Sequence, residues 1–159
     1  MFKQLTIVIA ALCASLAVPM GAQAAATIER GPIEVVLRFG SATDGFELSP
    51  NMLQLETGKP YKLVITNPSS TTHYITAPEF AAAVSTRKVE ITGGNVERKR
   101  FLRTKLGIPR RLPVIGEIEL RAGGKAEWYF TGNDAGRFPI ECGIPAHAQA
   151  GMVGEIIVE

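Results

Sequence analysis

The chain is poor in histidine and cysteine, with two of each among its 159 residues, and its formal net charge is only +2. It has no internal repeats, no low-complexity tracts and no linker-like segment, which excludes a repeat protein and argues against a second domain. The apolar fraction of 46% excludes a disordered chain and is enough for one hydrophobic core. The sequence therefore predicts one globular domain.

The N-terminus has the features of a secretory signal peptide. Lys3 supplies a positive charge, residues 5–20 form an apolar run, and residues 22–24 (Ala-Gln-Ala) are a small-residue cleavage site. We expect residues 1–24 to be cleaved, residues 25–159 to form the mature domain, and the protein to be periplasmic.

Export makes the shortage of cysteine informative. Cys13 lies in the apolar run and is lost with the signal peptide, so Cys142 is the only cysteine of the mature chain. A single cysteine cannot form an internal disulfide, and a free thiol is a liability in an oxidising compartment. Cys142 is therefore expected to be buried, reactive or bound to a metal.

Most of the mature chain has the period-two alternation of half-buried strands. Residues 93–94 (Gly-Gly) are expected to break the chain, and residues 122–124 (Ala-Gly-Gly) to form a turn. A helix is expected over residues 77–85, within an insertion at about 77–113, because Pro78 suits a first helical turn. The predicted fold is all-β, a Greek-key β-sandwich with this insertion. The expected strands are 33–39, 46–50, 53–56, 61–66, 115–121, 126–130, 138–142 and 152–158.

The C-terminal stretch contains a thiol, an imidazole and a thioether in regular spacing, Cys142-x4-His147-x4-Met152. Two histidines and a cysteine with a weak axial methionine are the ligands of an electron-transfer copper site. The only other histidine of the chain is His73, which follows a predicted strand and a Ser/Thr-rich loop. The four residues together predict a metal site made of His73, Cys142, His147 and Met152.

Each of these residues also has a simpler interpretation. Cys142 and Met152 could be core residues, and His73 could be a solvated surface histidine. Cys142 beside His147 could be a nucleophilic thiol with its base, although no local hydrolase signature accompanies them. Zinc is a further alternative, but structural zinc sites use closed sets of cysteine and histidine rather than a thioether.

The ligand pattern resembles the cupredoxins, the family of small mononuclear type 1 blue copper proteins. His73, after the segment Ile65-Thr66-Asn67-Pro68, matches the family's first histidine ligand, and Cys142, His147 and Met152 match its C-terminal ligand loop. The spacing in that loop is similar to that of rusticyanin and the plantacyanins. The resemblance covers most of residues 33–159 and implies one type 1 copper ion.

The resemblance implies a carrier of single electrons between respiratory redox partners, such as a cytochrome c and a terminal oxidase. The alternative is a periplasmic copper-binding protein for trafficking, storage or resistance. An enzyme is not expected, because copper oxidases and nitrite reductases need a second copper site, and two histidines cannot build both sites.

Two segments are candidate docking surfaces for a redox partner. The first is the uncharged patch around His147, because weak redox encounters use small interfaces. The second is the basic segment 98–111, which with its flanks has seven Lys/Arg against the single acid Glu97. It would suit an acidic partner protein or anionic lipid headgroups at a membrane surface, or it is a solvated loop. Export, and the lack of interleaved aromatic residues, argue against nucleic acid.

Overall fold

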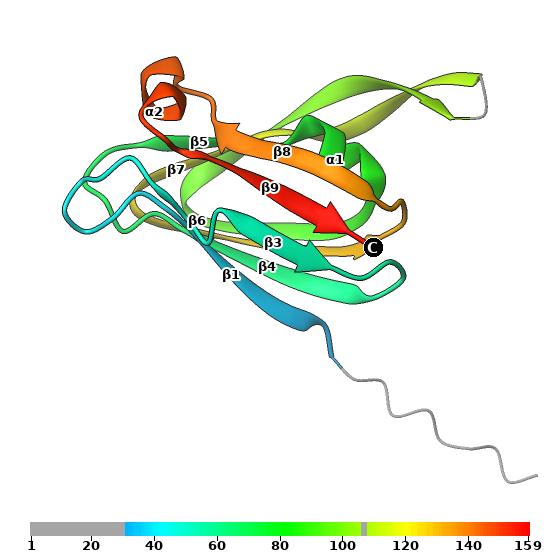
Figure 1. The fold of residues 1–159 in the computed structure, drawn as a ribbon, viewed down its shortest axis with the longest axis horizontal. Coiled ribbons are helices and arrows are strands. Elements are labelled where there is room, and N and C mark those ends of the chain that lie inside the picture. Colours follow the sequence, from blue (N-terminus) through cyan, green and yellow to red (C-terminus); the bar gives the residue numbers. More distant parts are fainter. Residues whose placement is uncertain (1–30, 106–107) are drawn as a thin grey trace, which may run out of the picture.

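The computed structural model describes residues 31–105 and 108–159, and these form a β-sandwich with two short helices (Figure 1). The all-β Greek-key prediction is confirmed. The elements are β1 (Ile33–Phe39), β2 (Leu48–Ser49), β3 (Met52–Leu55), β4 (Pro60–Thr66), β5 (His73–Thr76), α1 (Pro78–Ala83), β6 (Val84–Lys105), β7 (Ile108–Gly132), β8 (Gly136–Cys142), α2 (Pro145–Gln149) and β9 (Val153–Val158).

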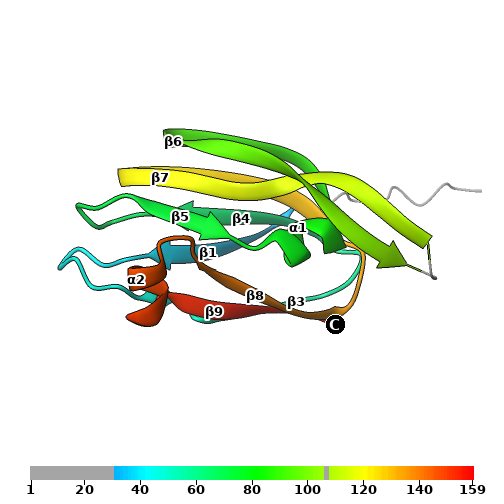
Figure 2. The same ribbon diagram turned by 90° about the horizontal axis from the view of Figure 1, so that it is seen from above.

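The strands follow one hydrogen-bonded path, β2-β1-β4-β7-β5-β8-β9-β3, and β6 pairs with β7 beside this path. The β1–β4 and β3–β9 pairs are parallel and the other pairs are antiparallel. In Figure 2, β8 and β9 lie on one side of the molecule and β6 and β7 on the other. Strands that follow one another in the sequence are therefore often not neighbours in the sheet. Residues that are far apart in the sequence can thus meet at one end of the sandwich.

The two halves of β7 pair with different strands, because its second half pairs with β4 and its first half pairs with β5. Between the two halves, residues 121–124 form a bulge opposite Gly93 of β6. Gly93 and Gly123 both have positive φ values, +69° and +68°, which glycine adopts without strain. The expected break at 93–94 and turn at 122–124 were therefore wrong. The glycines allow a bulge where the long strands β6 and β7 pair, and the chain does not reverse direction there.

The part of the predicted insertion that follows the helix belongs to a long antiparallel hairpin of β6 and β7. The β6–β7 register continues from Val84↔Gly132 to Lys105↔Ile108, and its far end extends beyond the body of the sandwich (Figure 1). The helix expected over 77–85 is present as the shorter α1, with Pro78 in its first turn, and Val84 and Ser85 already belong to β6.

Three sequence predictions rest wholly or partly on residues outside the described set. The signal peptide, residues 1–24, and its cleavage site lie there, and so do the side chains of residues 99–113 that carry most of the basic segment. Within the described part of the chain, no helix is long and apolar enough to cross a membrane.

The core lies between the layers and includes an aromatic cluster beneath α1. Phe80 is fully buried and contacts the ring of Trp128 edge-on at a centroid distance of 5.3 Å. The Phe80 ring is also perpendicular to Phe130 at 5.1 Å and tilted against Phe138 at 5.9 Å. This one side chain therefore anchors α1 to β7 and β8.

We expect Phe80→Ala to lower the free energy of unfolding by about 3–5 kcal/mol, because it leaves a cavity where three aromatic rings meet. Phe80→Leu, which refills most of the volume, should cost less. Urea unfolding of the three proteins measures both effects. A loss below about 1 kcal/mol in the alanine variant would mean that this ring does not anchor α1.

Candidate metal centre

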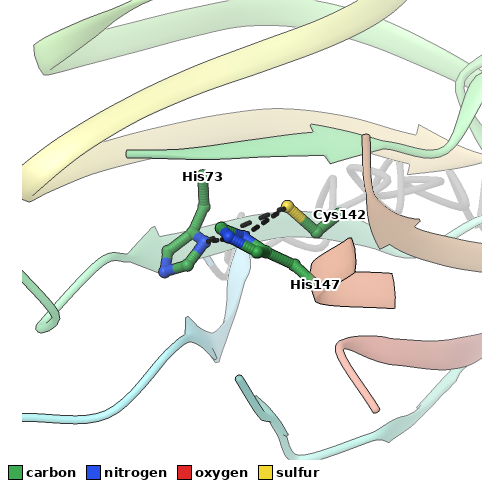
Figure 3. A group of neighbouring side chains, drawn as sticks. All are labelled: His73, Cys142 and His147. Carbon is green, nitrogen blue, oxygen red and sulfur yellow. Dashed lines mark hydrogen bonds between the residues drawn. The ribbon is translucent and has the colours of Figure 1, made fainter. Parts of the chain in front are cut away.

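Three of the four predicted ligands meet at one end of the sandwich (Figure 3). His73 is the first residue of β5, Cys142 is the last residue of β8, and His147 lies in α2. The Nδ1 atoms of His73 and His147 are 3.2 Å apart. The Sγ of Cys142 is 3.9 Å from Nδ1 of His73 and 3.7 Å from Nδ1 of His147.

This triangle has the size that a single metal ion requires. An ion at its centre, about 2.0 Å from each nitrogen and about 2.3 Å from the sulfur, would need edges of about 3.5 and 3.7 Å. The observed edges are close to these values, so only small adjustments separate the three side chains from a trigonal ligand set. Two imidazoles and a thiolate suit copper by their softness and geometry.

Met152 is completely buried and immediately precedes β9. Its backbone holds the ligand loop together, because the carbonyl oxygen of Met152 accepts a hydrogen bond from the N–H of Cys142 at 3.0 Å. The N–H of Met152 donates to the carbonyl oxygen of His147, also at 3.0 Å. These contacts bring the residue to the centre, and the role of its thioether as axial ligand stays a prediction.

The ring of His73 is oriented by a chain of polar side chains. Its Nε2 is 2.9 Å from Oγ of Ser69, and the Ser69 hydroxyl donates to Oδ1 of Asn67 at 2.7 Å. The Ser69 hydroxyl is also 3.2 Å from the carbonyl oxygen of Thr71, and with its hydrogen directed at either acceptor its oxygen can accept a hydrogen bond from Nε2–H of His73. This tautomer leaves the lone pair of Nδ1 facing Cys142 and His147, as a metal ligand needs.

Asn67 is itself a buried hub that ties the His73 loop to β7. Its Nδ2 lies within hydrogen-bonding distance of the carbonyl oxygens of Thr71 (2.6 Å), Leu120 (2.9 Å) and Arg121 (3.1 Å). Its Oδ1 accepts from both the backbone N–H and the hydroxyl of Ser69. The loop before His73 is therefore fixed by hydrogen bonds rather than by apolar packing.

Close packing and burial complete the surroundings of His73. A Cβ at Gly40, where φ is +80°, would lie 2.7 Å from Nε2 of His73, so the ring occupies space that only a glycine leaves open. Burial lowers the pKa of His73, the nearby charge of His147 lowers it further, and the carboxylate of Asp44 opposes both effects. The neutral form that binds metals is thereby favoured.

His147 lies in a different environment. It is half-buried, on the single helical turn α2, which was not predicted from the sequence. Its imidazole stacks on Phe46 with ring centroids 4.2 Å apart and an angle of 26° between the planes.

Sequence reasoning missed Ser69, Gly40 and Phe46 as neighbours of the ligands. Ser69 carried a signal, because Asn and Ser ahead of a strand are typical of loops held by side-chain-to-backbone hydrogen bonds. Gly40 and Phe46 carried none, since their importance depends on a contact between segments far apart in sequence.

Comparison with known proteins establishes the fold. No family model matches the chain. The chain is 34% identical over 85 residues to the copper-resistant cuproprotein CopI of Rubrivivax gelatinosus, a match that covers 45% of this chain and 50% of the relative. The chain thus matches about half the length of this curated relative.

Solved structures agree with the sandwich. Auracyanin A, a "blue" copper protein from Chloroflexus aurantiacus, is 16% identical with a TM-score of 0.51, over 81% of this chain and all of that one. The McoA multicopper oxidase from Aquifex aeolicus is 12% identical with a TM-score of 0.56, over 81% of this chain but 30% of the oxidase. The chain has a cupredoxin-like fold.

We expect Asn67→Ala to lower the free energy of unfolding by roughly 3 kcal/mol, because it leaves the N–H of Ser69 and buried carbonyl oxygens without partners. Asn51→Ala, in the exposed turn before β3, is the matched control and should change the free energy by less than about 0.5 kcal/mol. Chemical unfolding of the metal-free proteins gives both values. Equal losses in the two variants would show that the hub does not hold the loop.

Proposed function

We propose that the protein binds one copper ion through His73, Cys142 and His147, with Met152 as the axial ligand, and carries single electrons. The observation that supports this best is the triangle of Nδ1, Nδ1 and Sγ atoms, with edges of 3.2–3.9 Å, on a cupredoxin-like fold. These donor types in this geometry are those of an electron-transfer copper site.

The rigidity of the ligand positions supports electron transfer. Bound copper would supply one-electron redox chemistry, cycling between Cu(I) and Cu(II). His73 and Cys142 belong to paired strands, β5 and β8, and both are almost completely buried. A frame that holds its ligands in fixed positions keeps the reorganisation between the two oxidation states small.

The exposure of the ligands suggests where electrons pass. His73, Cys142 and Met152 have exposed fractions of 0–1%, whereas His147 is half-buried and is flanked by the exposed Pro145 and Ala146. A donor or acceptor, such as a cytochrome c or a terminal oxidase subunit, would dock over this edge or on the basic segment 98–111. We place the mature protein in the periplasm, consistent with the signal-peptide pattern of its first residues.

Copper trafficking or resistance is the second candidate, and one observation favours it. The relative from Rubrivivax gelatinosus is named as a copper-resistant cuproprotein, and it is similar to about half of this chain. Against this candidate, three of the four proposed ligands are buried, while a protein that hands copper on needs ligands that a partner can reach. Catalysis by the chain alone is disfavoured, since its two histidines cannot build a second copper site.

The proposed site is tested by titrating the purified mature protein with Cu(II) while recording visible absorption and electron paramagnetic resonance. An intense thiolate-to-copper band should saturate at one equivalent and be absent from Cys142→Ser. The control is necessary because weak copper binding at surface groups would not depend on the thiol. A band that persists without Cys142, or no intense band in the wild type, would reject the site.

Met152→Leu tests the axial ligand. The variant should still bind copper through the other three ligands, and its reduction potential should rise, because the methionine sulfur donates electron density that favours Cu(II). Met52→Leu, on an exposed methionine of β3, is the matched control. Voltammetry of the copper-loaded proteins gives the potentials. An unchanged potential and spectrum in Met152→Leu would remove Met152 from the ligand set.

A further inference from the structure

The two histidines of the centre are held by different means. Nε2 of His73 is hydrogen-bonded to Ser69. Among residues 31–98 and 114–159, whose side chains the structure describes, the hydrogen bonds of the His147 ring involve Nδ1 alone. Metal-binding histidines are usually oriented by a hydrogen bond from the second ring nitrogen to a protein group or water. Among the described residues, no protein group does this for His147.

Local backbone structure does not replace that hydrogen bond. His147 lies on a helix of five residues with no side-chain cap, and helices this short are not stable by themselves. The backbone bond from Met152 N–H to His147 O fixes the main chain at this point, but it does not set the rotation of the imidazole about its side-chain bonds.

The ring of Phe46 is the group that faces the imidazole. The nearly parallel planes, 26° apart at 4.2 Å, allow His147 to turn its Nδ1 toward the centre while its flat side is covered. Phe46 keeps 39% of its surface exposed, so core packing alone does not account for its position. A stacked aromatic pair contributes stabilisation beyond the area that it buries.

The loop that carries Phe46 is itself well defined. Gly40 N–H donates to Glu47 O at 2.8 Å and closes the loop at its base, and Gly45 N–H donates to Oγ of Ser41 at 3.0 Å. Oδ1 of Asp44 accepts a 2.7 Å hydrogen bond from the N–H of Ser70, in the loop that leads to His73. Phe46 is thus connected by hydrogen bonds to the same loop that orients the first histidine.

We propose that Phe46 is a positioning residue for His147: its ring holds the imidazole in the ligand-ready orientation before metal binds and slows the departure of this ligand afterwards. The second half of this inference rests on the proposed copper site. His147 is the least buried of the three clustered ligands, so its rotation outward is the natural first step of metal loss, and that rotation must break the stack with Phe46.

The first test uses the metal-free protein and NMR of the imidazole resonances of His147. In the wild type, a ring stacked on Phe46 should show an upfield ring-current shift and one dominant side-chain orientation. Phe46→Ala and Phe46→Leu should both lose that shift, and Met52→Ala, which removes an even more exposed apolar side chain, should keep it. The same His147 spectrum in all four proteins would overturn the proposal.

The second test measures how fast copper passes from the loaded protein to a strong Cu(I) chelator. Loss of the stack should raise the rate constant between about twofold and tenfold in Phe46→Ala and Phe46→Leu, while Met52→Ala matches the wild type. Unfolding midpoints of all four proteins check that the fold is retained. Equal transfer rates in the Phe46 variants and Met52→Ala would overturn the kinetic half of the proposal.

The two tests separate this proposal from the proposed function. If the wild type binds no copper, the proposed function fails, and the metal-free spectra still decide whether Phe46 orients His147. If copper binds with an intense thiolate band, but the His147 spectra and the copper transfer rates are the same in the Phe46 variants as in the wild type, the copper site stands and the positioning role is rejected.

Discussion

Hydrogen bonds converge on the buried side chain of Asn67, and the arrangement of the centre depends on them. The amide nitrogen is directed at carbonyl oxygens of its own loop and of β7, and the amide oxygen fixes Ser69. Because the Oγ of Ser69 lies 2.9 Å from Nε2 of His73, this polar side chain in the core holds the ring with Nδ1 toward Cys142. A buried amide left unsatisfied is costly, so this loop has little freedom to rearrange.

Cys142, His147 and Met152 are held by β8, the loop that follows it and the start of β9. Cys142 ends β8 and Met152 precedes β9, and the backbone hydrogen bond between them closes the ligand loop at its base. Within that loop His147 is the exception, since a single helical turn and the ring of Phe46 hold it where strand pairing does not reach. The centre therefore has a buried side, formed by His73, Cys142 and Met152, and a half-buried side, formed by His147.

The sequence was sufficient for much of the fold and for the ligand cluster. Period-two alternation marked β1, β4 and β8 because one face of each strand packs on the core, and the spacing of Cys142, His147 and Met152 reflects a loop between paired strands. His73 could be chosen because only two histidines exist. The bulge in β7 could not be foreseen, because positive-φ glycines are needed equally by turns and by bulges.

The contacts between distant segments were also hidden from sequence reasoning. Phe46 meets His147 across about a hundred positions, and Gly40 meets His73 only because the end of β1 and the start of β5 lie close together. Helix α2 was missed because its five residues contain a proline and are too short to show a helical period. Such features depend on tertiary packing rather than on local pattern.

The most direct test of the account is a crystal structure of the copper-loaded protein with anomalous diffraction recorded on both sides of the copper absorption edge. The account predicts one strong copper peak between Nδ1 of His73, Nδ1 of His147 and Sγ of Cys142, with the sulfur of Met152 on the axis. The protein ligands should lie close to the positions described above. A copper peak away from Cys142, or a Met152 sulfur directed elsewhere, would contradict it.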